Sequence, residues 1–170
     1  MPVDIYFSGS LWDCEGEASK NMGRFIEFFC GVWYNGRMVK FNEQMSKERA
    51  RGMNAVVLAF IGDAVYSLYV RESLVFASDY KTGTLQKLSS ERVSAKGQAK
   101  LAERLSGVFT ETEQEIFMRG RNAKKPTRSK NATVAEYNVS TGFEAVIGYL
   151  YLTGNYDRID QLIGEGCDED

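Results

Sequence analysis

The chain has 170 residues, of which 44% are hydrophobic and 26% are charged, and its formal net charge is -2. These proportions are those of an ordinary globular protein, and the length allows one domain with a sizeable core. The sequence contains no histidine, which excludes histidine-based nucleophilic, acid–base and metal-binding chemistry. Its three cysteines, Cys14, Cys30 and Cys167, form no C-x-x-C pair, so they predict neither a disulfide framework nor a zinc site.

The charges of the chain are segregated along its length. Six basic residues and no acidic residue lie between Arg119 and Lys130, and four acids lie between Glu165 and Asp170. No apolar run reaches the roughly 18 residues of a membrane span, and the N-terminus lacks the pattern of a signal peptide. We therefore expect a cytoplasmic protein with no membrane segment.

Residues 1–37 differ in character from the rest of the chain. They hold both tryptophans, two of the three cysteines and an aromatic-rich patch at 25–34, with no sustained helical or strand periodicity. One interpretation is a small accessory segment that packs its aromatic side chains on the main domain. The other, which we favour, is a start codon assigned too far upstream, with methionines available at 38, 45 and 53. We expect the main domain at 38–164 and an acidic tail at 165–170.

The first half of the main domain predicts helices. Residues 42–53 are polar and mixed in charge, which is typical of one or two solvated turns leading into an apolar helix at about 54–71. A short helix is expected to begin at Thr82 or Thr84 and to run to about residue 89. Residues 92–105 predict an amphipathic helix with a basic face, and Gly107 is a plausible stop.

Two capping boxes mark the helices of the second half. Thr110-Glu-Thr-Glu113 predicts a helix to about residue 119, and Thr133-Val-Ala-Glu136 predicts a long helix to about residue 153. A last helix is expected at 158–163. Because no alternating strand pattern is present, the fold class is predicted to be all-α.

One acid, Asp63, lies within an otherwise apolar helix. The segment 56–70 is apolar around almost its whole circumference, which predicts a buried helix. An ionised carboxylate there would cost several kcal/mol unless it were paired, hydrogen-bonded or bound to a metal. Glu144 lies in a second apolar helix, and two such acids facing one point would suit Mg²⁺, which can polarise a phosphodiester and acidify water. An arginine or a helix end is the alternative partner for each acid.

Small and aromatic residues accompany these acids. Gly62 and Gly148 lie inside predicted helices, where glycine costs up to about 1 kcal/mol relative to alanine, so we expect close helix packing beside the acids. Tyrosines on the same helices are expected in the core or in a dimer interface rather than stacked on bases; they are Tyr66, Tyr69, Tyr149 and Tyr151.

Two of these motifs carry a family resemblance. The run Ala59-Phe-Ile-Gly-Asp-Ala-Val65 resembles the signature helix of the ribonuclease III family, and Phe143-Glu-Ala-Val-Ile-Gly-Tyr-Leu-Tyr-Leu152 resembles its second metal-binding helix. The segments 89–99 and 119–124 are similar to the short Mini-III branch, which lacks a double-stranded-RNA-binding domain. The resemblance covers about 52–163. It implies an all-α ribonuclease III-type helical bundle that forms a homodimer.

The resemblance also implies a site. Asp63 and Glu144 would be the catalytic Mg²⁺ ligands, with Gly62 and Thr141 in support and Thr141 orienting a water. The wider family has acids at the positions of Ala59 and Thr141. Only two acids per protomer then remain, and the number of metal ions stays open.

The implied substrate is double-stranded RNA, and specifically the paired ends of precursor 23S ribosomal RNA, cleaved to 5′-phosphates and 3′-hydroxyls. A large-subunit ribosomal protein is a candidate partner that would present the RNA. The basic loop and a basic helix supply the expected RNA contacts, which are Arg119, Arg121, Asn122, Lys124, Lys125, Arg128, Lys130, Lys96 and Lys100.

Two other functions compete with this one. The first is a catalytically silent ribonuclease III-fold protein that binds RNA in association with the ribosome. The second is a helical metal-dependent nucleotide hydrolase, which would need more clustered acids. Glu111, Glu113 and Glu115 lie in a first helical turn, where capping explains them.

Overall fold

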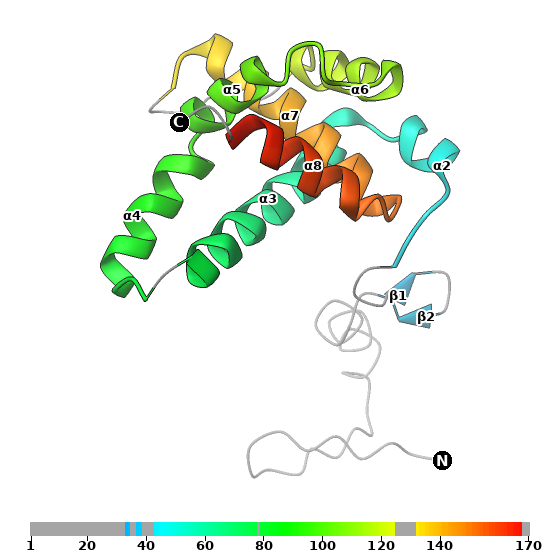
Figure 1. Ribbon diagram of the computed structural model, residues 1–170. Coiled ribbons are helices and arrows are strands. Elements are labelled where there is room, and N and C mark those ends of the chain that lie inside the picture. Colours follow the sequence, from blue (N-terminus) through cyan, green and yellow to red (C-terminus); the bar gives the residue numbers. More distant parts are fainter. Residues whose placement is uncertain (1–32, 35–36, 39–42, 78, 125–131, 168–170) are drawn as a thin grey trace, which may run out of the picture. The chain divides into compact units, whose positions relative to one another are not determined.

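The fold is described from a computed structural model (Figure 1), which covers residues 33–34, 37–38, 43–77, 79–124 and 132–167. The chain divides into two units, 1–43 and 44–170. In the first unit, β1 (Trp33–Tyr34) pairs with β2 (Arg37–Met38) in an antiparallel ladder that sets Trp33 opposite Met38. Strands of two residues are too short to give an alternating pattern. The limits proposed for the N-terminal extension and the acidic tail remain predictions.

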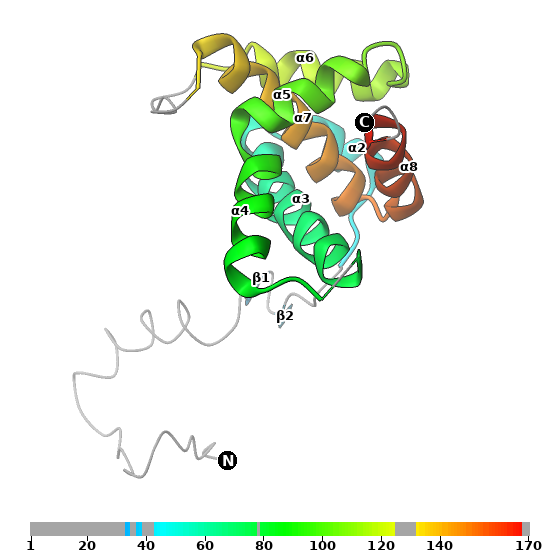
Figure 2. The same cartoon turned by 60° about the vertical axis from the view of Figure 1, so that its left-hand side comes forward.

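All the regular secondary structure described in the second unit is α-helical, as the all-α prediction requires. Its helices are α2 (Lys47–Gly52), α3 (Ala55–Ala77), α4 (Thr82–Val93), α5 (Ala95–Arg104), α6 (Glu111–Arg121), α7 (Val134–Leu152) and α8 (Tyr156–Cys167). Helix α7 contacts α2, α3, α5, α6 and α8 and lies at the centre of the unit (Figures 1 and 2). Among the described residues, no helix is both long enough and apolar enough to cross a membrane.

Helix α7 is the buried centre of the core. Every residue from 140 to 150 is buried except Glu144, which is half-buried. The capping box at its start is confirmed, because the backbone N–H of Glu136 donates to Thr133 Oγ1 and the backbone N–H of Thr133 donates back to the Glu136 carboxylate. The helix ends at Leu152, and Gly154 follows with φ +73°. The capping box therefore predicts where this helix begins, and its apolar composition predicts its burial.

Helix α3 differs from its prediction in two ways. It continues to Ala77 rather than ending near residue 71, and one of its faces is exposed. Phe60 is 82% exposed, and Val57, Leu68 and Val75 are each at least half exposed. The prediction of a helix buried all round is wrong here. When a helix is apolar on all sides, its sequence does not show which face packs on the core and which face is free to contact another molecule.

A break at Ser94 divides the helix that was predicted to run over 92–105. Ser94 Oγ accepts from the Gly97 backbone N–H (3.0 Å) and donates to the Glu91 carbonyl (2.8 Å). The residue thereby closes α4 and caps α5, the role for which serine is favoured at helix N-termini. Helix α4 also runs to Val93, beyond the limit expected near residue 89. Lys81, rather than Thr82 or Thr84, is its N-cap residue.

Helix α2 is a separate element rather than the first turns of α3. Asn54 interrupts the helix, and its Oδ1 accepts from the Val56 backbone N–H at 2.8 Å. The guanidinium of Arg119 on α6 donates to the carbonyl oxygens of Arg51 (2.6 Å) and Met53. These bonds satisfy carbonyls that the end of a helix leaves open. They fix α2 against α6.

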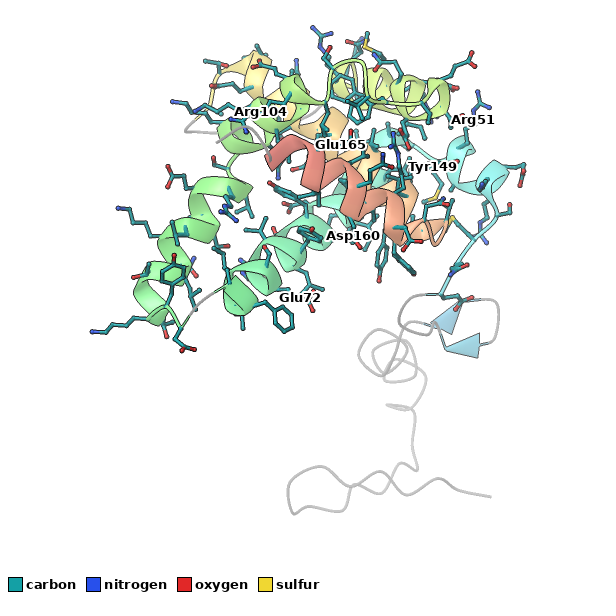
Figure 3. The ribbon with its side chains drawn as sticks, in the orientation of Figure 1. Arg51, Glu72, Arg104, Tyr149, Asp160 and Glu165 are labelled. Atoms are coloured by element: carbon teal, nitrogen blue, oxygen red, sulfur yellow. The ribbon has the colours of Figure 1, made fainter. Side chains whose placement is uncertain are left out.

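The last helix, α8, is longer than the predicted 158–163 and is joined to α5 and α6. Arg104 of α5 donates to the Gly166 carbonyl at 3.0 Å, and Figure 3 shows Arg104 beside the end of α8 that carries Glu165. At the other end, the Arg158 guanidinium donates to both oxygens of Glu113, at 3.0 and 2.9 Å. Glu113 is only 4% exposed. It also completes the predicted capping box of α6 by accepting from the Thr110 backbone N–H.

This buried pair makes stability depend on pH. Burial opposes ionisation of Glu113, but the hydrogen bonds from Arg158 and Thr110 outweigh it, so the pKa of Glu113 lies below its ordinary value of 4.5. The ionised carboxylate therefore stabilises the folded state fully above about pH 4.5, and this contribution is lost as the pH falls through the lower folded-state pKa.

We expect Arg158→Gln to lower the free energy of unfolding at pH 7 by about 3 kcal/mol, because it leaves a buried carboxylate without its counter-charge. The deficit relative to the parent protein should shrink as the pH falls towards 4, since protonation of Glu113 removes the uncompensated charge. Urea unfolding at both pH values measures this difference. Arg92→Gln, at an exposed site on α4, is the matched control. A deficit equal at the two pH values would contradict the assignment.

Candidate metal centre at the crossing of two helices

Helices α3 and α7 cross in backbone contact. A Cβ atom built on Gly62 would lie 1.8 Å from the carbonyl oxygen of Glu144 and 2.8 Å from the backbone nitrogen of Gly148. A Cβ atom on Gly148 would lie 2.0 Å from the carbonyl oxygen of Leu58. Both contacts are far closer than a side chain allows, so only glycine fits at either position. The close helix packing predicted beside the acids is confirmed.

The crossing brings the segments of the two predicted acids together. Asp63 directly follows Gly62, and Glu144 is the residue whose carbonyl Gly62 touches. Asp63 is exposed, whereas Glu144 is half-buried. The expected burial of Asp63 is therefore wrong, and the energetic anomaly that it implied does not exist. Solvent therefore reaches Asp63 freely and Glu144 in part.

The core side of the crossing is aromatic. Tyr66, one turn after Asp63, is 4% exposed and packs edge-on against Phe143, with ring centroids 5.1 Å apart. Tyr149 is also buried, and Tyr69 and Tyr151 are partly buried against the same core. These tyrosines are core residues, as predicted, and they pack on the core side of the crossing.

Small or hydroxyl side chains precede the two acids on their own helices. One turn before the acids stand Ala59 on α3 and Ser140 and Thr141 on α7, and all three are buried. The hydroxyls of Ser140 and Thr141 both donate to the Tyr137 carbonyl, at 3.1 and 2.9 Å. The proton of Thr141 is thus used within its own helix. Its predicted role in orienting water stays a prediction, and it would have to use the lone pairs of the oxygen.

The donor set suits a hard divalent ion. In the described part of the chain, no group of three or more histidine, cysteine, aspartate or glutamate side chains could hold a metal. Two carboxylates on crossing helices remain, and Mg²⁺ is commonly bound by one or two carboxylates while keeping several waters. Asp63 and Glu144 would therefore be a donor set of the kind that Mg²⁺ accepts.

The predicted RNA contacts fall into three groups. Lys96 and Lys100 are exposed on α5, and Arg121, Asn122 and Lys124 are exposed at the end of α6. Arg119 is instead engaged with the carbonyls that end α2. The remaining predicted contacts lie outside the described residues, and they are Lys125, Arg128 and Lys130.

Two clefts that the sequence does not reveal meet at Arg121. One, of about 380 Å³, lies between α5 and α6 and has apolar walls that include Phe109 and Phe117. The other, of about 440 Å³, extends along the start of α7 past Val134 and Asn138. Arg121 lines both clefts, and its guanidinium lies 4.0 Å from the sulfur of Met118. Arg121 is therefore a cationic side chain that the two clefts share.

The exposed face of α3 forms a further surface, which the sequence analysis did not predict. Val57, Phe60, Ala64, Leu68 and Val75 are exposed and recur every three, four or seven residues, so they form one stripe along the helix. We call it the α3 stripe. The sequence does contain a signal for this surface. Apolar residues lie on every side of the helix, whereas a helix with a single core-facing side needs them on that side only.

Comparison with known proteins agrees with this arrangement. The Ribonuclease III domain family matches residues 56–155. Mini-ribonuclease 3 of Streptococcus pneumoniae is 46% identical over 113 residues, which are 65% of this chain and 88% of that protein. Mini-ribonuclease 3 of a Thermoanaerobacter species is 41% identical over 121 residues, covering 71% and 85% of the two chains.

A solved structure has the same fold. The crystal structure of a Fusobacterium nucleatum protein superposes with a TM-score of 0.61 at 32% identity, covering 67% of this chain and 91% of that one. The family match includes both helices of the crossing, from the first turn of α3 to the end of α7. The chain therefore belongs to the ribonuclease III family and, within it, to the short Mini-ribonuclease 3 branch.

Proposed function

We propose that this chain is a Mg²⁺-dependent endoribonuclease that trims the paired ends of precursor 23S ribosomal RNA in the cytoplasm. Membership of the Mini-ribonuclease 3 branch makes it a double-strand-specific endoribonuclease. The observation that carries the metal-dependent mechanism is the glycine crossing, which sets the segments of Asp63 and Glu144 against each other. A large-subunit ribosomal protein that presents the RNA remains part of the proposal.

Asp63 and Glu144 would hold the metal ion. When bound, Mg²⁺ would place positive charge beside the scissile phosphate and favour loss of a proton from the attacking water. Glu144 is fixed by its position on the buried helix α7, whereas Asp63 stands at the solvent edge, where RNA can arrive. Gly62 and Gly148 set the distance between the helices that carry these acids. Such fixed positioning is what a charge-stabilised phosphodiester cleavage requires of a protein.

The exposed cations would follow the backbone of the duplex. Arg121 and Lys124 lie at the end of α6, and Lys96 and Lys100 lie on α5, which packs against α7. Contacts from such side chains to phosphates add affinity and fix orientation while carrying little sequence information. We omit Arg119 from this surface because its guanidinium supports the end of α2.

A second copy of the chain would cover the α3 stripe. Phe60 and its neighbours on the stripe form an apolar surface three residues from Asp63, and surfaces of this kind commonly mark protein interfaces. A two-fold dimer built on this surface would be self-complementary and would carry two metal sites. Each site could then cut one strand of a duplex, which has a matching pseudo-two-fold symmetry.

We expect Phe60→Glu to weaken the dimer by at least about 100-fold, equivalent to about 3 kcal/mol, because it removes a large apolar contact and buries a charge. Phe76→Glu is the matched control, since Phe76 is 83% exposed on the same helix but lies about 100° from Val75 and off the stripe. Sedimentation equilibrium measures both dissociation constants. Equal effects of the two substitutions would exclude the stripe as the interface.

The function itself is tested by incubating the full chain with a duplex from a precursor 23S ribosomal RNA end. We expect cleavage in Mg²⁺, none in EDTA, and recovery when excess Mg²⁺ is added, with 5′-phosphate and 3′-hydroxyl products. Binding without cleavage would instead favour the silent RNA-binding protein. Cleavage of unrelated duplexes alone would retain the nuclease and overturn the proposed substrate.

A further inference from the structure

We propose that the cleft between α5 and α6 binds an unpaired nucleotide of the RNA substrate, with a preference for guanine. This inference deepens the proposed function, because it rests on RNA being the substrate. Helices α5 and α6 both pack on α7 (Figures 1 and 2), and Val139 of α7 also lines the cleft. The volume of the cleft is about 380 Å³, which lies in the range of small-molecule binding sites.

The walls of this cleft are largely apolar. The rings of Phe109 and Phe117 line it with their centroids 5.5 Å apart, and both side chains are only partly buried. Further apolar surface comes from Ala102, Met118 and Val139. The outside of a duplex does not match such a surface, because paired bases keep their ring faces stacked inside the helix. An unpaired base can instead place its face on aromatic side chains.

A cation extends from the cleft on each of its two helices. Side chains three or four residues apart share a helix face, and Lys100 lies three residues before Glu103, which lines the cleft on α5. On α6, the guanidinium of Arg121 lies 4.0 Å from the sulfur of Met118. Lys100 and Arg121 are both exposed. They can meet the phosphates that flank a base held in the cleft, and this charge favours a nucleic acid over an uncharged apolar partner.

Two polar side chains allow the cleft to discriminate between bases. Glu103 comes from α5 and Gln114 from α6, and both are exposed. A carboxylate only accepts hydrogen bonds, and its two oxygens can accept two neighbouring donors. Guanine presents two such donors on its Watson–Crick edge, N1–H and the 2-amino group, whereas uracil presents N3–H alone. Glu103 therefore favours guanine over uracil.

Fluorescence anisotropy of the full chain in EDTA, where no cleavage is expected, tests this inference. Three duplexes share one paired sequence and carry the same short overhang made of guanosines, of uridines or of abasic nucleotides, so their phosphates are equal in number. The overhang is 3′ in one series and 5′ in another. In at least one series we expect guanosines to bind at least about fivefold more tightly than abasic nucleotides, since base stacking on an aromatic side chain contributes at least this factor. Uridines should lie between the two.

Three variants locate the effect in the cleft. Ser106 is exposed and lines the cleft, so Ser106→Trp should fill it without disturbing the core and bring guanosine and abasic overhangs within about twofold. Ser90→Trp, at an exposed site on α4, is the matched control and should keep the parent ratio. Glu103→Gln should bring guanosine and uridine overhangs within about twofold. A parent ratio in folded Ser106→Trp would overturn the inference.

A cross-linking measurement needs no substitution. We expect 6-thioguanosine in the overhang, once irradiated, to cross-link to the parent chain within residues 102–121, which include the α5 and α6 walls of the cleft. Cross-links confined to other segments would overturn the inference. Equal binding of the three overhangs, with each duplex still cleaved in Mg²⁺, would overturn this inference alone and favour a protein segment as the occupant. A chain that cleaves none of them would overturn the proposed function as well.

Discussion

Asp63→Asn is expected to reduce cleavage of duplex RNA in Mg²⁺ by at least about 1000-fold, a loss of about 4 kcal/mol of transition-state stabilisation. The reason is that the amide removes one of the two carboxylates proposed to hold the ion. Because Asp63 is exposed, the substitution should leave the thermal unfolding midpoint within a few degrees of the parent value. Glu144→Gln should cause a loss of similar size. Initial cleavage rates and thermal unfolding measure the two quantities.

The matched control lies on the same helix. Glu72 is an exposed acid on α3 (Figure 3), and Glu72→Gln makes the same carboxylate-to-amide change away from the crossing. We expect this variant to cleave at the parent rate. If Asp63→Asn were folded and fully active, the assignment of the metal ligands would be wrong whatever the behaviour of the control.

The second large effect is expected from Gly62→Ala. In the interior of a helix this change normally stabilises by up to about 1 kcal/mol. Here the added methyl group would lie 1.8 Å from the Glu144 carbonyl oxygen, so α3 and α7 must move apart. We expect the free energy of unfolding to fall by about 3 kcal/mol, at the upper end for overpacking. We also expect cleavage to fall at least about 10-fold, because a small misplacement of catalytic groups is costly.

Gly164→Ala provides the comparison for this change. Gly164 lies inside α8, and a Cβ atom built there meets nothing within 4 Å. Its substitution should raise the free energy of unfolding, whereas Gly62→Ala lowers it. Chemical denaturation of the two variants measures these opposite signs. A Gly62→Ala protein as stable as the parent would show that the helices do not meet as described.

Local signals in the sequence predict much of this fold. The capping boxes at Thr110 and Thr133 fix where α6 and α7 begin, because each box uses two residues whose hydrogen bonds are made within one turn. Helix-interior glycines likewise predict the close crossing, since their cost in a helix requires a compensating contact. The choice of Asp63 and Glu144 as the candidate site comes instead from the resemblance of their two helices to the ribonuclease III family.

The exposure of Asp63 and the hydrogen-bond partners of Arg119 could not be predicted, because both depend on tertiary interactions. The sequence around Asp63 suggests a buried acid, yet Asp63 is exposed because the apolar face beside it is left uncovered by the rest of the chain. Arg119 belongs to a run of basic residues. Its guanidinium nevertheless donates hydrogen bonds to the carbonyls of Arg51 and Met53, which lie more than sixty positions earlier in the chain. No local pattern encodes such long-range partners. From its charge alone, Arg119 was therefore grouped with the neighbouring basic residues as an RNA contact.

In the proposed metal site, Asp63 of α3 and Glu144 of α7 hold a catalytic ion between the two helices. Anomalous diffraction from crystals of the full chain soaked in Mn²⁺ tests it most directly. We expect a Mn²⁺ peak at the crossing in each protomer, with a carboxylate oxygen of each acid in its coordination shell at roughly the 2.1 Å typical of Mg²⁺ ligands. A Mn²⁺ peak bound elsewhere, or carboxylates too far apart to share one ion, would contradict it.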